Sequence, residues 1–322
     1  MAWMVTGGAG YIGAHIVRAL QAHGENVVVL DDLSTGEVRK IPDGVPLVVA
    51  SVGDRDAVAS VMKEHDVTGV VHLAAKKAVG ESVARPLFYY RENVDGLLSL
   101  LEAMLDVGVT KLVYSSSAAT FGMPDVDRVT EDSACAPESP YGETKLVGEW
   151  IMRDAARAHG IDFVSLRYFN VAGAGAPELG DTGVFNLVPM VFRALSTGHK
   201  PEVFGDDYAT RDGSCERDYI HVADLADAHV AAVRRLAEGS AQLTYNVGRG
   251  EGVTVKEVMA AVGEATGLDV DYEVVARRPG DPDKIVAVPD RIVADLGWRA
   301  SHDLTDMVTS AWAAWQAYPP SV

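Results

Sequence analysis

The 322-residue sequence contains only two cysteines, Cys135 and Cys215, and they do not have the spacing of metal ligands. We therefore expect two ordinary thiols, with neither a disulfide framework nor a metal site. Apolar runs are too short to span a membrane, and the first begins a few residues after Met1, which leaves no room for a signal peptide. These absences predict a cytoplasmic protein with no membrane partner.

Basic residues are in the minority, since 28 Lys and Arg stand against 46 Asp and Glu, a formal net charge of -18. Nucleic acids and anionic membranes attract clustered cations, so neither is expected as the main partner. There are no internal repeats or low-complexity linkers, and the hydrophobic content of 48% is that of an ordinary globular protein. The length exceeds one minimal core, which indicates one large domain or two interleaved domains.

A glycine cluster follows the first apolar run, at Gly7, Gly8, Gly10 and Gly13. Apolar residues then recur at helical spacing, so the segment is expected to form a strand, a tight turn and a helix. Residues without side chains let the backbone approach a pyrophosphate, whose charge then lies at the N-terminus of the helix. The pattern predicts a dinucleotide cradle, and a glycine-rich turn without a nucleotide is the alternative.

Two aspartates come directly after the next apolar run, residues 27–30. Asp31 has the distance from the glycines that is typical of a carboxylate accepting hydrogen bonds from an adenosine ribose. Asp31 and Asp32 together would repel a 2′-phosphate, and no Arg or Lys directly follows them, so the sequence predicts NAD rather than NADP. Asp54 follows a further short strand and could contact the nucleotide base, although a helix cap fits its position nearly as well.

Strand and helix patterns alternate as far as about Asn170. Strands are expected at 47–50, 69–75, 111–114 and 163–167, and helices at 58–63, 86–107 and 140–155. This alternation predicts an α/β fold, a doubly wound parallel sheet of the Rossmann type covered by helices. Beyond Val171 the chain is rich in loops and begins a second, smaller α/β domain. We expect an NAD-binding domain over 1–171, to which 217–249 returns, and a second domain mainly over 172–322.

Tyr141 and Lys145 lie four residues apart, on one face of a helix expected to begin near Pro140. An ammonium beside a phenol lowers the pKa of the phenol and makes it a usable general base. Ser117, at the end of the preceding strand, can orient or relay the proton. A tyrosine and lysine at this spacing also occur by chance, but here they follow a dinucleotide pattern.

Together these motifs resemble the extended short-chain dehydrogenase/reductases, and within them the UDP-glucose 4-epimerases, over essentially the whole chain. The stretches that carry the match are residues 6–13, 31–36, 72–82, 115–122, 141–145, 167–170, 217–225 and 277–281. The stretches 77–82 and 204–208 are more particular to the epimerases.

The resemblance implies an NAD-dependent isomerase that inverts C4 of a UDP-hexose, UDP-glucose or UDP-galactose, through a transient 4-keto sugar. It implies that Tyr141, helped by Ser117, removes the proton of the 4-hydroxyl as hydride passes to the nicotinamide. The keto sugar would then rotate about its diphosphate linkage and take the hydride back on its other face. Lys145 would also hold the nicotinamide ribose.

The resemblance also implies the binding residues and the assembly. The cofactor contacts would be Gly7, Gly10, Tyr11, Ile12, Gly13, Asp31, Ser34, Thr35, Gly36, Asp54, Lys77, Tyr141, Lys145 and Tyr168. The substrate contacts, mainly in a UDP-sugar-binding second domain, would be Ser117, Tyr141, Asn170, Asn186, Leu187, Phe204, Arg217, Tyr219, Arg278 and Asp281. A homodimer is expected, through the helices around 93–107 and 141–159.

The sequence departs from the family pattern at a few positions. Phe121 replaces a usual tyrosine, which removes a hydroxyl near the sugar, and Ile285 lies at a position that sizes the pocket. Asp32, Lys76 and Glu92 also differ from the common residues. Epimerisation of UDP-N-acetylglucosamine, UDP-glucuronate or a UDP-pentose therefore remains an alternative, and a non-catalytic NAD-binding regulator is a second one, opposed by the intact Ser117, Tyr141 and Lys145 set.

Overall fold

The computed structural model describes residues 2–278 and 280–320, which form two compact units. Unit 1 comprises residues 2–120, Pro137–Arg167 and Ala226–Tyr245. Unit 2 comprises Phe121–Ala136, Tyr168–Leu225 and the described residues from Asn246 onward. Within the segment 217–249, residues 226–245 thus belong to unit 1 and the residues on either side belong to unit 2. The chain passes several times between the units, so they are interleaved.

Unit 1 is built on a seven-stranded sheet in the order β11-β7-β5-β4-β1-β2-β3, and the predicted doubly wound fold is confirmed. Neighbouring strands from β3 through β2, β1 and β4 to β5 pair in parallel. The strands are β1 (Ala2–Thr6), β2 (Val27–Asp31), β3 (Leu47–Val49), β4 (Val67–His72), β5 (Lys111–Ser117), β7 (Asp162–Tyr168) and β11 (Gln242–Val247). Because the strand order reverses next to β1, the loops after β1 and β4 flank the usual ligand crevice of such sheets.

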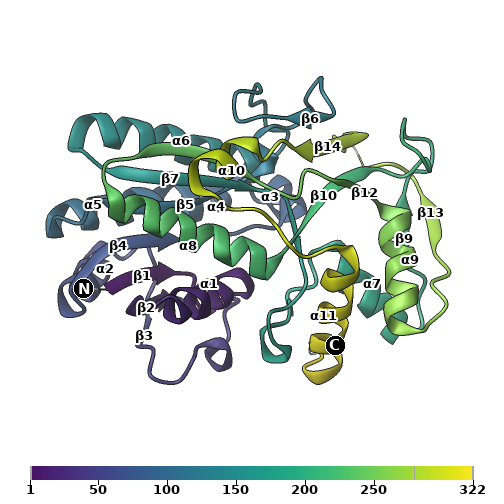
Figure 1. Ribbon diagram of the computed structural model, residues 1–322, viewed down its shortest axis with the longest axis horizontal. Coiled ribbons are helices and arrows are strands. Elements are labelled where there is room, and N and C mark those ends of the chain that lie inside the picture. The colour runs from purple at the N-terminus through teal and green to yellow at the C-terminus, as the bar shows by residue number, and fades with distance from the viewer. Residues whose placement is uncertain (1, 279, 321–322) are drawn as a thin grey trace. The chain divides into compact units, whose positions relative to one another are not determined.

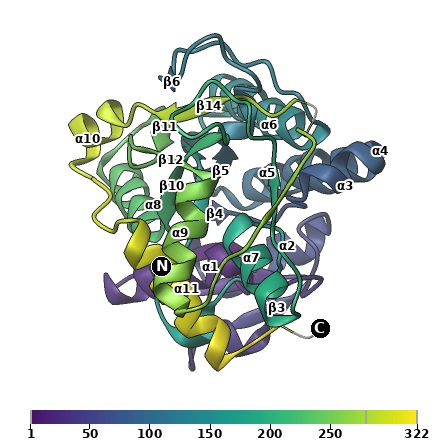
Figure 2. The same ribbon diagram turned by 90° about the vertical axis from the view of Figure 1, so that its right-hand side faces the viewer.

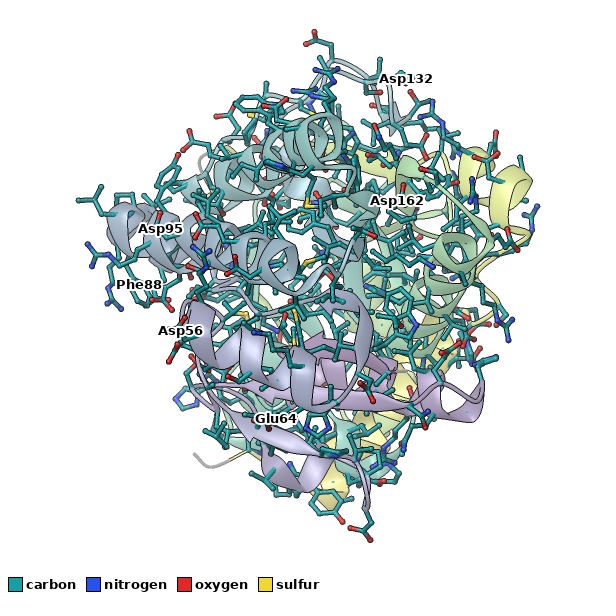
Figure 3. All side chains as sticks on the ribbon, turned by 90° about the vertical axis from the view of Figure 1, so that its left-hand side faces the viewer. Asp56, Glu64, Phe88, Asp95, Asp132 and Asp162 are labelled. Carbon is teal, nitrogen blue, oxygen red and sulfur yellow. The ribbon has the colours of Figure 1, made fainter. Side chains whose placement is uncertain are left out.

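Helices cover both faces of this sheet, as the predicted alternation requires. They are α1 (Tyr11–Ala22), α2 (Arg55–Glu64), α3 (Val79–Ala84), α4 (Pro86–Tyr90), α5 (Gly96–Val107), α6 (Pro140–His159) and α8 (Val222–Glu238). The apolar faces of α2, α5 and α6 share one buried cluster with the strands, whereas α1 and α8 lie on the opposite face (Figures 1 and 2). Figure 3 shows the outer side of α2, where Asp56 and Glu64 project away from that cluster.

The helix expected at 86–107 is interrupted. A π-helical turn, Arg91–Asp95, separates α4 from α5. The buried Asn93 lies in this turn, and its side chain bonds to the Lys76 backbone rather than to its own helix. π-turns of this kind are frequent next to functional sites.

Unit 2 contains a second, five-stranded sheet in the order β12-β10-β14-β6, with β8 pairing β10, and a two-stranded sheet, β13-β9. Its strands are β6 (Arg128–Val129), β8 (Asn170–Ala172), β9 (Glu202–Phe204), β10 (Glu216–His221), β12 (Gly252–Thr254), β13 (Glu273–Val275) and β14 (Lys284–Ala287). Its helices are α7 (Leu187–Ser196), α9 (Val255–Thr266), α10 (Asp290–Leu296) and α11 (Leu304–Ala317). A separate apolar cluster from α7, α9, α11 and the strands forms its core.

Among the described residues, no helix is long and apolar enough to cross a membrane. Across the same residues, no group of three or more His, Cys, Asp or Glu side chains is arranged to hold a metal ion.

Candidate active site

The turn between β1 and α1 is closely packed, and its glycines are there for steric reasons. Gly7 has a φ of +71°, and a Cβ on it would lie 2.8 Å from the Ala74 nitrogen in the loop after β4. A Cβ on Gly13 would lie 2.1 Å from the Gly7 carbonyl oxygen. Gly10 precedes α1 without a side-chain cap. A helix start without a side-chain cap suits an anion beside the turn.

The carboxylate of Asp31 is held by backbone amides on both sides. Its Oδ2 accepts a hydrogen bond from the Ala9 nitrogen at 2.9 Å, and its Oδ1 accepts one from the Leu33 nitrogen at 2.8 Å. Burial raises the pKa of this carboxyl, while the two amide bonds act to lower it. Gly36 leaves room for the carboxylate, because a Cβ there would lie 2.7 Å from Oδ1.

The other predicted cofactor contacts in unit 1 have varied settings. Tyr11 is buried and Ile12 half-buried at the start of α1, whereas Ser34 and Thr35 are exposed. The exposed Lys77 has its ammonium 6.0 Å from the centre of the Tyr11 ring.

Two predicted cofactor contacts stand apart from this group. Asp54 caps α2, because its side chain accepts a hydrogen bond from the Ala57 nitrogen at 3.1 Å, which is the alternative that the sequence left open. Tyr168, the last residue of β7, belongs to unit 2.

Ser117, Tyr141 and Lys145 come together between the end of β5 and the start of α6. Pro140 occupies the first turn of α6, and the Ser139 hydroxyl accepts a hydrogen bond from the Gly142 nitrogen at 3.2 Å, so the helix begins directly before Tyr141. The Ser117 hydroxyl acts on the Tyr141 phenol and lowers its pKa against the effect of burial. Lys145 Nζ lies 5.9 Å from the centre of the Tyr141 ring. An acid–base pair and a cation thus share one small region of unit 1.

The pKa of the phenol differs from the sequence expectation. The sequence predicts a lowered pKa for Tyr141, but burial raises it above the usual value of a phenol. The opposing, lowering effect comes from Ser117 rather than from the Lys145 charge. Lys145 Nζ instead donates to the Ser115 carbonyl oxygen at 2.8 Å. Burial lowers the pKa of Lys145 to about 8. Lys145 therefore keeps its charge at neutral pH while tying α6 to β5.

A buried ion pair that the sequence did not reveal supports this region. Glu149 lies one helical turn after Lys145, and its carboxylate accepts Arg167 Nε at 2.8 Å and another guanidinium nitrogen of Arg167 at 2.6 Å. The Ser116 hydroxyl donates to the same carboxylate at 2.6 Å. These bonds join β5, α6 and β7. The spacing of Tyr141, Lys145 and Glu149, four residues each, is the signal that could have indicated one functional helix face.

In unit 2, the predicted substrate residues form two contacts with one another. Arg217 on β10 donates to Asp281 at 2.5 Å. The Arg278 guanidinium stacks on the Phe204 ring, 3.7 Å from its centre. Pro279, which lies between Arg278 and Asp281 in the chain, is outside the described residues.

The remaining predicted substrate residues also lie in unit 2. Asn170 on β8 is in register with Tyr219 on β10. Asn186 precedes α7 and donates to Asp181 at 2.6 Å, and Leu187 is the first residue of that helix. The two asparagines therefore lie at the start of a strand and of a helix, whereas Tyr219 lies inside β10.

The two positions that the sequence predicts to bear on the sugar are both buried in unit 2. Phe121 packs against Phe169, with 6.4 Å between the ring centres. Ile285 on β14 is in register with Arg217.

Comparisons with known proteins agree over nearly the full length. A model of the NAD dependent epimerase/dehydratase family matches residues 3–248. A UDP-glucose 4-epimerase of Azospirillum brasilense is 45% identical over 320 residues, 97% of this chain and 91% of that protein. The structure of UDP-glucose 4-epimerase from Bifidobacterium longum with NAD+ and UDP has a TM-score of 0.93 at 35% identity, covering 99% of both chains. The UDP-Glc/GlcNAc 4-epimerase of Campylobacter jejuni has a TM-score of 0.87 at 35% identity, covering 98% of this chain and 99% of that one.

Proposed function

The chain belongs to the NAD-dependent epimerase/dehydratase family, and we propose on this basis that it is an isomerase inverting C4 of a UDP-hexose, with UDP-glucose and UDP-galactose as its pair of substrates. The observation that carries the proposal is the pairing of Ser117 with Tyr141, whose ring centre lies 5.9 Å from Lys145 Nζ. It places a proton-transferring group in the same unit as the glycine turn and Asp31. A non-catalytic regulator would not need this pair.

The residues of unit 1 fit NAD. The glycine turn is too tight for side chains and ends at the uncapped start of α1, which suits a pyrophosphate. Both oxygens of Asp31 are oriented by backbone amides and keep lone pairs for ribose hydroxyls. The proposed contacts are Gly7, Gly10, Tyr11, Ile12, Gly13, Asp31, Ser34, Thr35, Gly36, Asp54, Lys77, Tyr141, Lys145 and Tyr168. When bound, NAD supplies the acceptor and then the donor of the hydride.

Proton transfer at the sugar belongs to Tyr141 in this proposal. Its phenolate accepts the proton of the 4-hydroxyl, the resulting phenol later returns it, and Ser117 lowers the pKa of the phenol. Lys145 remains cationic near neutral pH and fixes the start of α6 through its bond to the Ser115 carbonyl.

Unit 2 is proposed to hold the UDP group. Arg217 and Arg278 offer guanidinium donors to the diphosphate, and Asp281 orients Arg217. Phe204, stacked by Arg278, offers a flat apolar face to the uracil ring. The other proposed contacts are Asn170, Asn186, Leu187 and Tyr219.

A second candidate is 4-epimerisation of another UDP-sugar, such as UDP-N-acetylglucosamine, UDP-glucuronate or a UDP-pentose. The observation that favours it is Phe121, whose ring packs on Phe169 and brings no hydroxyl to the region where a tyrosine is usual. A pocket with one hydroxyl fewer is less selective for substituents on the sugar.

The test is to incubate the purified protein separately with UDP-glucose, UDP-N-acetylglucosamine and UDP-glucuronate, and to resolve the C4 epimers by anion-exchange chromatography. We expect UDP-galactose from UDP-glucose, without net NADH accumulation. Reaction of only another sugar would overturn the sugar assignment and direct attention to Phe121 and Ile285. No reaction with any sugar, even with NAD supplied, would reject the epimerase proposal.

We also propose that the protein acts in the cytoplasm as a homodimer, through α5, α6 and the adjoining helices. Large apolar side chains are exposed there in the single chain, including Leu87 at 78%, Leu98 at 42% and Trp150 at 48%. Figure 3 shows Phe88, on α4, at the outer margin of the same unit. Burial of such a surface against a second copy would remove it from water.

Charged substitutions test this assembly. Leu98→Glu combined with Trp150→Glu is expected to give a monomer in size-exclusion chromatography with light scattering, because two carboxylates would be buried in the interface. Leu268→Glu is the matched control, since Leu268 is 46% exposed in unit 2 and is expected to leave the dimer intact. A wild-type monomer would contradict the proposal.

A further inference from the structure

One lysine lies in an unexpected place beside the ribose-binding end of unit 1. Lys76, in the loop after β4, donates from Nζ to the Ser34 hydroxyl at 2.8 Å, across 42 residues of chain. The same Nζ lies 3.9 Å from an Asp32 carboxylate oxygen and 3.9 Å from a Glu92 carboxylate oxygen. Ser34 in turn donates to Asp32 at 2.7 Å. The four side chains form what we call the Lys76 cluster.

The backbone of Lys76 is fixed, so its side chain starts from a defined point. The Lys76 nitrogen donates to Asn93 Oδ1 at 2.8 Å, and Asn93 Nδ2 donates back to the Lys76 carbonyl oxygen at 3.0 Å. Asn93 is buried and also donates to Thr144 Oγ1 on α6 at 3.0 Å. The Lys76 side chain itself is 21% exposed, so its ammonium is partly shielded from water.

The cluster adjoins the carboxylate proposed to hold the adenosine ribose. Asp32 follows Asp31 directly, and the Lys76 charge acts on both carboxyls, favouring their ionised forms. A cation near this carboxylate is what a nucleotide 2′-phosphate requires. The sequence indicated no such cation, because no Lys or Arg directly follows the two aspartates. The fold supplies one from the end of another strand.

The carboxylates outnumber that cation. Asp32 and Glu92 both face the Lys76 ammonium, and Asp31 stands next to Asp32. A 2′-phosphate would therefore meet an excess of negative charge, although a suitable donor is present. Asp32, Lys76 and Glu92 are also three positions at which the sequence departs from the family pattern.

We propose that Asp32 and Glu92 determine the preference for NAD by neutralising Lys76, and that Lys76 is a latent ligand for the 2′-phosphate of NADP. The inference rests on the proposed dinucleotide site. When the two carboxylates become amides, the ammonium is released to the phosphate, while Asp31 still accepts bonds from a ribose hydroxyl.

The experiment measures NAD and NADP binding by calorimetry to protein freed of nucleotide. The variants are D32N/E92Q, K76M and D32N/E92Q/K76M, each checked by circular dichroism for folding. D32N/E92Q is expected to bind NADP at least about tenfold more tightly than wild type, the effect of one charge-assisted hydrogen bond. Adding K76M is expected to remove that gain. K76M alone is expected to leave NADP binding as weak as in wild type.

The outcomes separate this inference from the proposed function. If wild type binds NAD but D32N/E92Q shows no gain for NADP, the inference is overturned and the cofactor proposal stands. If the gain persists without Lys76, simple loss of repulsion explains it and Lys76 is not the ligand. If folded wild type binds neither nucleotide, the proposed cofactor site itself fails.

Discussion

Tyr141→Phe is expected to lower turnover of UDP-glucose by about 10²–10⁴-fold, the usual contribution of a positioned acid–base group. The substitution removes only the phenolic oxygen. The ring is expected to stay buried at the start of α6, which Ser139 and Pro140 fix. Folding is therefore expected to survive, and NAD binding is expected to lose only the contact of the phenolic oxygen. The measurement is the initial rate of epimer formation, together with NAD binding by the same variant. Unchanged turnover would remove Tyr141 from the catalytic role.

Ser117→Ala is the companion variant, because it keeps the phenol and removes the hydroxyl that acts on it. That hydroxyl lowers the pKa of Tyr141 against the effect of burial, so its loss raises the pKa. Turnover that needs the ionised phenol rises with pH up to this pKa. The rising limb of the pH profile is therefore expected to move to higher pH in Ser117→Ala. A limb that does not move would assign the ionisation to another group.

Glu149→Ala is expected to lower the free energy of unfolding by about 3–5 kcal/mol, because the buried Arg167 guanidinium loses the Glu149 carboxylate to which it donates two hydrogen bonds. The side chains of the two residues are 9% and 8% exposed. Turnover is also expected to fall, since the same helix carries Lys145 and Tyr141 one and two turns earlier. The measurements are denaturant-induced unfolding followed by circular dichroism and the rate of epimer formation.

Two controls show whether the lost stability comes from burying the Arg167 charge without the Glu149 carboxylate. Glu149→Leu with Arg167→Met replaces the whole pair by apolar groups and is expected to recover most of the lost stability. Ser116→Ala removes one hydrogen bond to the carboxylate and is expected to cost only about 1 kcal/mol. Stability of Glu149→Ala equal to that of wild type would refute the supporting role of the pair.

Local patterns in the sequence determined a large part of this protein. The glycine spacing predicted the tight turn before α1, because only residues without Cβ fit where Gly13 meets the Gly7 carbonyl. The apolar run before Asp31 predicted β2, and the four-residue spacing predicted that Tyr141 and Lys145 share one face of α6. Strand and helix periods are short, so a single stretch of chain carries the signal.

Contacts between distant segments were decided only by the tertiary structure. Lys76 reaches the loop after β2, and Arg167 and Ser116 both bond to Glu149, because parallel strands place their carboxyl ends at one edge of a sheet whatever their order in the chain. Burial, which raises the pKa of Tyr141 and lowers that of Lys145, likewise depends on packing by several elements. No spacing along the chain encodes these distances or the exposure of a side chain to water. The pKa of Tyr141 and the position of the Lys76 ammonium beside Asp32 therefore follow from the fold.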